Sequence, residues 1–154
     1  MEEFRVLVVD DEKDFLETFV NRLRKRNLDV TGVESGEKAI ELMDKHLFDV
    51  VILDVKMPGM DGVETLREMK TKRPLTEVIM LTGHASVESG IEGMKLGAFD
   101  YIMKPADIDE LMDKIRQANE KKLLHEEKIR QAKVKELMGA PARVLEQITK
   151  DERT

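Results

Sequence analysis

Five short apolar runs rich in Val and Ile alternate with segments of helical spacing along most of the chain. Within each run the apolar residues are nearly continuous, which is typical of strands buried on both faces of a sheet. In each intervening segment they lie three or four positions apart, as on one face of an amphipathic helix. The predicted strands cover residues 4–9, 30–33, 50–53, 78–81 and 99–103. This alternation predicts an α/β fold.

Strict alternation of strands and helices predicts a doubly wound, five-stranded parallel sheet covered by helices on both faces. We expect the flavodoxin-like order 2-1-3-4-5, with strands one and three adjacent where the order reverses. Ser35, Asp61 and Asp107 lie where three of the helices should begin, as capping residues do. In such a sheet ligands bind beyond the carboxyl ends of the strands.

Composition excludes several classes of protein. The chain has no cysteine, so disulfides, thiolate zinc sites and cysteine nucleophiles are excluded. Residues 1–119 contain 25 acidic and 17 basic residues, and residues 120–154 contain seven and nine, so we expect no direct nucleic-acid partner. The acidic start differs from a signal peptide, and no apolar run approaches the roughly 18 residues that span a bilayer. We therefore expect a cytoplasmic protein without membrane attachment.

Polar residues directly follow four of the predicted strands: Asp10 and Asp11, Asp54, Thr82, and Lys104. With the order 2-1-3-4-5 the three carboxylates converge, and because they repel one another the site calls for a cation. An all-oxygen site of this kind suits Mg²⁺, and Mn²⁺ could substitute. Asp54, the most central, is the predicted nucleophile for a phosphoryl group, since carboxylates form acyl phosphates.

Four stretches of the sequence resemble, in order and spacing, the signature blocks of response-regulator receiver domains, which share the fold of the chemotaxis regulator and act in two-component signal transduction. They are RVLVVDDE, DVVILDVKMPGMDG, VIMLTGHAS and GAFDYIMKP. The strand-end residues in them are separated by intervals of 43, 28 and 22 residues, counted from Asp11. The resemblance runs from about residue 4 to about residue 120.

The resemblance implies a role for each residue that matches the family's blocks. Asp54 would be the phosphoacceptor, and Mg²⁺ would be held by Asp54, by Asp11 directly, by Asp10 through water and by the backbone carbonyl of Lys56. Such a protein would take its phosphoryl group from a sensor histidine kinase or a phosphotransfer protein. It would be a signalling switch that phosphorylates and dephosphorylates itself, and not a turnover enzyme.

A second set of implied roles concerns the bound phosphate and the response to it. Thr82, Gly83 and Lys104 would bind the phosphate, and the Lys104–Pro105 bond would be cis, which is essentially a proline feature. Thr82 and Tyr101 would form the switch pair that alters the surface of the fourth helix, fifth strand and fifth helix. That surface would bind a downstream protein target or a second copy of the chain.

Several alternatives remain open from the sequence. Asp10 and Asp11 could instead be turn and N-cap residues of the first helix. Tyr101 could be a packing residue, and His84 could line the mouth of the site or lie in an exposed loop. Haloacid-dehalogenase-like phosphohydrolases also place a nucleophilic Asp after a parallel strand, but they have a second Asp two residues later, where this chain has Lys56.

The sequence predicts a receiver domain at residues 1–120 and a helical extension, followed by a short helix or tail, at 121–154. Nothing breaks the last helix between about Asp107 and Gly139, which makes it roughly 30 residues long. Heptad spacing continued from its core stripe is too polar for a strong coiled coil. A solvated helix, a weak dimerisation helix and a connector in a larger regulator remain open. The extension is too short for a DNA-binding or enzymatic output module, so we expect output through binding. The positions in that heptad spacing are Lys122, His125, Ile129, Ala132 and Glu136.

Overall fold

A computed structural model describes residues 4–55, 61–83 and 87–139. Strands and helices alternate without exception through these ranges. The strands are β1 (Arg5–Val9), β2 (Asp29–Val33), β3 (Val50–Leu53), β4 (Glu77–Thr82) and β5 (Asp100–Met103). The helices are α1 (Lys13–Arg24), α2 (Gly36–Lys45), α3 (Gly62–Lys72), α4 (Val87–Lys95) and α5 (Ile108–Gly139).

The five strands form one parallel sheet in the order β2-β1-β3-β4-β5, so the predicted fold is confirmed. β1 pairs with β2 on one side and β3 on the other, and Val9 lies opposite both Val33 and Leu53. The carboxyl ends of these three strands are therefore level with one another. The order in which successive strands are added to the sheet reverses between β1 and β3. Side chains that follow these two strands therefore meet at this point.

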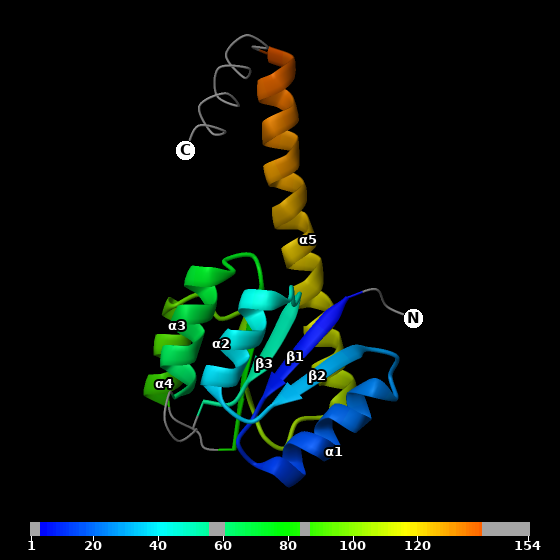
Figure 1. Ribbon diagram of the computed structural model, residues 1–154, viewed down its shortest axis with the longest axis vertical. Helices are drawn as coiled ribbons and strands as arrows, with labels where there is room; N and C mark the ends of the chain where they lie inside the picture. Colours follow the sequence, from blue (N-terminus) through cyan, green and yellow to red (C-terminus); the bar gives the residue numbers. More distant parts are fainter. Residues whose placement is uncertain (1–3, 56–60, 84–86, 140–154) are drawn as a thin grey trace. The chain divides into compact units, whose positions relative to one another are not determined.

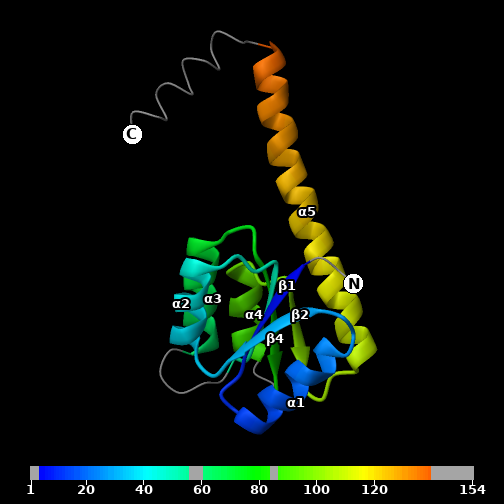
Figure 2. The ribbon, with the colours of Figure 1, turned by 45° about the vertical axis from the view of Figure 1, so that its right-hand side comes forward.

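Successive strand residues face opposite sides of the sheet and build two separate cores. Val6 and Val8 of β1 belong to the core beneath α1 and the first turns of α5, whereas Leu7 and Val9 belong to the core beneath α2 and α3. Figures 1 and 2 show the same division, with α1 and α5 on one side of the sheet and α2, α3 and α4 on the other. Burial on both faces explains why the strands read as continuous apolar runs.

The predicted helix starts are confirmed at three positions. Ser35, Asp61 and Asp107 each accept a hydrogen bond from a backbone N–H in the first turn of α2, α3 and α5. Such caps satisfy donors that have no partner within the helix. They fix where each helix begins, and so the length of each loop between a strand end and the following helix.

α5 is a single helix of 32 residues, as the unbroken sequence predicted. The chain divides into two compact units, Met1–Lys122 and Leu123–Thr154, and α5 contributes residues to both. Within the first unit its buried side chains are Leu111, Met112, Ile115 and Ala118. The predicted short helix after Pro141 lies outside the described residues. Among the helices of the described residues, none combines the length and the apolar character that crossing a membrane requires.

Candidate functional site

Sheet hydrogen bonding continues past the strand ends and fixes the backbone of three predicted site residues. The N–H of Asp10 donates to the Val33 carbonyl (3.1 Å), that of Asp54 to the Val9 carbonyl (2.9 Å) and that of Lys104 to the Thr82 carbonyl (2.7 Å). Each of these residues is thereby tied to a neighbouring strand as well as to its own. The side chains are held at one edge of a rigid sheet and not on a free loop.

Three carboxylates gather at this edge. One oxygen from each of Asp10, Asp11 and Asp54 lies within 4.8 Å of the others. Asp10 is 2% exposed and Asp54 is 6% exposed, and Asp11 is the most accessible of the three. Burial of two like charges beside a third is unfavourable unless cations compensate. We refer to Asp10, Asp11, Asp54 and Lys104 together as the strand-end site.

Lys104 supplies the positive charge that the structure describes at this site. Its Nζ lies 2.6 Å from Asp10 Oδ2 and 4.0 Å from Asp54 Oδ2, and its side chain is only 14% exposed. The other oxygen of Asp10 accepts a hydrogen bond from the Glu12 N–H (2.9 Å), so the turn interpretation of Asp10 holds for that oxygen alone. Among the described residues of the site, one ammonium therefore accompanies three carboxylates, which is a surplus of negative charge.

The surplus and the chemistry of the donors fit a hard divalent cation. All donors are carboxylate oxygens, and they lie close enough together to share an ion. Mg²⁺ characteristically takes one or two carboxylates and keeps several waters, for which the accessible side of Asp11 leaves room. Lys56, the predicted carbonyl ligand, lies outside the described residues. The described residues therefore provide the three side-chain ligands of the predicted metal site.

Close approach of α3 to the end of β3 depends on Gly62, which the sequence had not singled out. A Cβ at this position would lie 2.5 Å from the Asp54 carbonyl oxygen and 2.5 Å from Val55 Cα. The Gly62 N–H donates to the Val55 carbonyl (2.9 Å). Only a residue without a side chain allows this contact, which ties the start of α3 to the backbone that carries Asp54.

Thr82 and Gly83 lie on the other side of Asp54, at the end of β4. Thr82 is buried (1% exposed) and Gly83 is exposed beside the Lys104 side chain, where a Cβ would meet Lys104 Cδ at 3.8 Å. The Lys104–Pro105 peptide bond is cis. The structure thus brings the predicted phosphate-binding residues to the same edge as the carboxylates.

Tyr101, the other predicted switch residue, lies on β5 opposite Met80 of β4. Both side chains belong to the same core. Because side chains alternate along β4, Thr82 faces the same side of the sheet as Met80 and therefore as Tyr101. Tyr101 is half-buried and lines an apolar hollow of about 600 Å³ together with Gly90, Ile91 and Met94. A change at Thr82 can reach this hollow through one side of the sheet. His84 lies outside the described residues.

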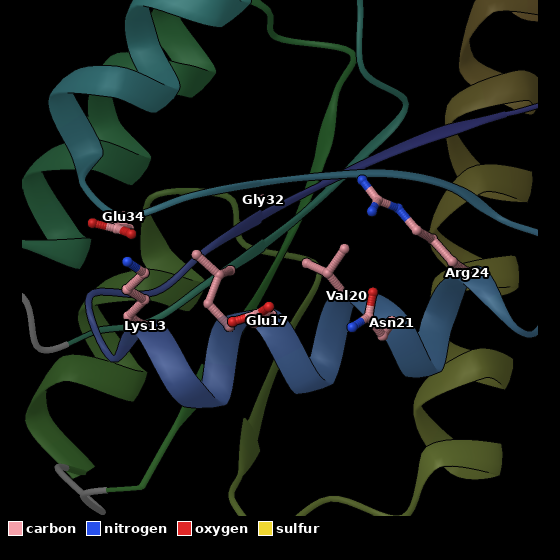
Figure 3. Close-up of a pocket in the computed structure, with 8 residues that line it drawn as sticks. Lys13, Glu17, Val20, Asn21, Arg24, Gly32 and Glu34 are labelled. Carbon is pink, nitrogen blue, oxygen red and sulfur yellow. The ribbon is translucent and has the colours of Figure 1, made fainter.

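A second hollow, of about 370 Å³, lies between α1 and β2 (Figure 3). Gly32 lines it, and α1 packs so closely against this glycine that a Cβ there would lie 2.9 Å from Val20 Cγ2. Lys13 and Glu34 lie toward one end and Arg24 toward the other, where its guanidinium donates to the Val30 carbonyl. Its charges of both signs are spread along the groove, in contrast to the surplus of the strand-end site.

Sequence reasoning gave no role at the strand-end site to Phe15 of α1, whose ring contacts that site. Lys104 Nζ lies 3.9 Å from the centroid of the Phe15 ring. Helical spacing groups Phe15 with buried positions and gives no sign of this contact. Its place in the first turn after Asp10 and Asp11 is the only signal in the sequence.

Comparison with known proteins agrees with this geometry. The family model of the response regulator receiver domain matches residues 6–116. The transcriptional regulatory protein ZraR of Escherichia coli is 38% identical over 113 residues, which are 73% of this chain and 26% of ZraR. The chain thus spans about a quarter of the length of such curated relatives.

Solved structures give the same result. A CheY-like response regulator receiver domain protein from Methanospirillum hungatei superposes with a TM-score of 0.77 at 28% identity, covering 80% of this chain and 99% of that one. A response regulator receiver domain protein from Clostridium thermocellum has a TM-score of 0.75 at 35% identity, covering 79% and 98%.

Proposed function

The chain belongs to the family of response regulator receiver domains of two-component systems, and on that premise we propose that Asp54 is its phosphoacceptor. The observation that carries this proposal is the surplus of carboxylates at the strand-end site. Asp54 is the carboxylate at the end of the central strand β3, and the single described ammonium faces it at 4.0 Å. A histidine kinase or a phosphotransfer protein would supply the phosphoryl group.

Asp10, Asp11 and Asp54, together with the backbone carbonyl of Lys56, would hold Mg²⁺, and Mn²⁺ could substitute. When bound, the ion neutralises negative charge that develops on the transferring phosphoryl group. The three described ligands favour this assignment because they present oxygen alone and lie within 4.8 Å of one another. The buried backbone of Asp10 and Asp54 keeps these ligands in place before any ion binds.

In the transfer step an Asp54 oxygen forms a bond to phosphorus while the bond from phosphorus to the donor breaks, and the electron pair leaves with the donor. Lys104 turns from Asp10 toward the phosphoryl oxygens. This movement is short because its ammonium already lies between Asp10 and Asp54. The Thr82 hydroxyl and the Gly83 N–H donate hydrogen bonds to the same group. These donors stabilise the negative charge on the phosphoryl oxygens during the transfer.

The phosphorylated state would be read out on the surface of α4, β5 and α5. Movement of Thr82 toward the phosphate leaves space on the side of the sheet that Tyr101 shares, and Tyr101 lines the hollow beside Ile91 and Met94. Ile91 and Met94 are 52% and 48% exposed, and apolar side chains of this size suit contact with a downstream protein. We propose a protein target and not DNA, because the 1–119 segment is acidic.

Acetyl phosphate with Mg²⁺ tests the phosphoacceptor directly. We expect one phosphoryl group per chain, bound to Asp54 and lost in Asp54→Asn. Asp29→Asn is the matched control, because Asp29 also lies at a strand of the sheet but pairs with Arg5 at the exposed edge. Labelling that survives Asp54→Asn would rule out the assignment, and repeated turnover of a generic phosphate ester would favour the phosphohydrolase alternative.

A homodimer is a second candidate response, and one face of the helix beyond Lys122 favours it. Residues 123, 134 and 137 lie on this face because the first two are 11 residues apart, about three turns, and the last two are neighbours three residues apart, and they are all large and apolar. We propose that two copies pair through this face when the domain is phosphorylated. Its exposed apolar side chains are Leu123, Leu124, Val134, Leu137 and Met138.

Solution mass tests the dimer. Light scattering with beryllofluoride, a mimic of the acyl phosphate, should give twice the monomer mass for the unaltered chain and the monomer mass for Leu137→Glu. Leu47→Glu is the control, because Leu47 is also an exposed leucine (65%) but lies in the loop before β3. Dimers that persist in Leu137→Glu would place the interface elsewhere.

A further inference from the structure

Among the described residues, three groups lie close to the Lys104 ammonium, and one of them carries no charge. It lies 2.6 Å from Asp10 Oδ2, 4.0 Å from Asp54 Oδ2 and 3.9 Å from the centroid of the Phe15 ring. We propose that Phe15 is a positioning residue for phosphoryl transfer, whose ring keeps this ammonium between the two carboxylates. The inference rests on the proposed role of Asp54.

The position of the ring is set by the core and not by the carboxylates. Phe15 lies in the first turn of α1, and its ring stacks on that of Phe19 with centroids 5.4 Å apart and planes inclined by 13°. Phe19 is 7% exposed, and Phe15 packs against the same core. The ring therefore stays in place whatever occupies the strand-end site.

A fixed ring matters because the principal partner of Lys104 has a second task. Asp10 pairs with the ammonium in this structure, but it is also one of the three carboxylates that would bind a cation. Once a cation competes for Asp10, a lysine with four rotatable bonds is free to move into solvent, and ordering it again during transfer costs conformational entropy. The ring face attracts the ammonium in both situations, since its quadrupole does not change.

The surroundings of Lys104 make this attraction effective. The side chain is 14% exposed, so water screens the contact weakly, and cation–π interactions are strongest when desolvated. The exposed Gly83 lies beside the Lys104 stem, where even a Cβ would stay 3.8 Å from Cδ. Gly83 therefore leaves the stem uncrowded while the ring holds its ammonium.

Three variants separate a positioning role from a structural one. Phe15→Leu removes the ring, Phe15→Tyr keeps it, and Phe19→Leu removes the neighbouring ring that does not touch Lys104. At saturating Mg²⁺ we expect the initial rate of acetyl phosphate labelling to fall about three- to tenfold in Phe15→Leu. Phe15→Tyr and Phe19→Leu should stay within about twofold of the unaltered chain. The Mg²⁺ concentration for half-maximal labelling should not rise in any of them.

An NMR measurement reports the contact without any reaction. The Hε protons of Lys104 should resonate upfield of those of the other lysines, because they lie over an aromatic face, and this shift should vanish only in Phe15→Leu. An unshifted Lys104 in the unaltered chain would overturn the inference. So would equal rate losses in Phe15→Leu and Phe19→Leu, or a full rate in Phe15→Leu. Failure of the unaltered chain to be labelled would instead overturn the proposed function and the inference with it.

Discussion

The two edges of the sheet carry the same kinds of residue and balance their charges in opposite ways. At the carboxyl edge three carboxylates face the ammonium of Lys104. At the amino edge Asp49, which precedes β3, pairs with Lys122 of α5 (2.8 Å). Glu77, the first residue of β4, pairs with Lys121 (3.5 Å) although it is only 2% exposed. At the amino edge each of these carboxylates has a lysine of its own.

The difference shows that buried acidic residues alone do not mark a functional site. Glu77 is as deeply buried as Asp10, yet its charge is matched by a neighbouring helix, and the pair fastens α5 to the sheet. A matched pair stabilises little beyond its desolvation cost. Three carboxylates that share one described ammonium favour the binding of a further cation, and this is the physical reason to place the chemistry at the carboxyl edge.

Removing one lysine from each edge should expose this difference most strongly. Lys104→Met leaves three carboxylates at the strand-end site without an ammonium, and we expect the free energy of unfolding to fall by about 3 kcal/mol in EDTA. Lys122→Met breaks a more exposed pair, so its loss should be about 1 kcal/mol. Urea denaturation of both variants measures the two values.

Repeating the denaturation in Mg²⁺ distinguishes the edges further. Mg²⁺ should recover most of the loss in Lys104→Met, because it supplies charge to the same carboxylates, and none of the loss in Lys122→Met. If Mg²⁺ rescues both variants equally, the ion acts on the whole chain and the contrast between the edges is wrong.

Mg²⁺ should also stabilise the unaltered chain through the carboxyl edge alone. At a concentration one hundred times its dissociation constant, a ligand that binds only the folded state adds about 2.7 kcal/mol. Asp11→Asn should abolish most of this gain, whereas Asp49→Asn should lower stability and leave the gain intact. Thermal unfolding across a Mg²⁺ titration checks both expectations. A gain that persists in Asp11→Asn would move the metal away from the strand-end site.

The fold and the carboxyl edge could be predicted because both follow from local order in the sequence. Continuous apolar strands separated by amphipathic helices specify a parallel sheet, and residues that directly follow its strands must meet at one edge. Asp10 and Lys104 form an ion pair across 94 positions of sequence for this reason alone. The spacing of the five strand-end residues was sufficient to predict that they meet at this edge.

The amino edge could not be predicted in this way. Asp49 directly precedes β3 and Glu77 begins β4, but no recognisable motif marks either residue, and their partners lie far away in the middle of α5. The face beyond Lys122 was missed for another reason. Strict heptad spacing continued from the core stripe includes neither Leu123 nor Val134, which lie 11 residues apart. An 11-residue repeat follows a straight helix more closely than a seven-residue repeat does.

Lys70 gives the smallest expected effect and tests whether the amino edge is balanced. Its Nζ donates to the Pro74 and Thr76 carbonyls (2.9 and 3.0 Å). Burial lowers the pKa of Lys70 below its ordinary value of 10.5, Glu77 opposes this by raising it, and Lys121 lowers it further. The charged form is therefore less favourable in the folded chain than in the unfolded chain.

Between the lowered pKa and about 10.5 the unfolded chain binds more protons at Lys70 than the folded chain, so stability should rise with pH in that window. The free energy of unfolding of the unaltered chain minus that of Lys70→Met should increase as the pH rises toward about 10.5, and the increase should be small because Lys70 is only partly buried. Lys72→Met, which removes a surface lysine paired with Asp44, gives the baseline. A difference that falls with pH would mean that Glu77 outweighs burial at Lys70, and that the amino edge, like the carboxyl edge, holds more negative charge than its lysines match.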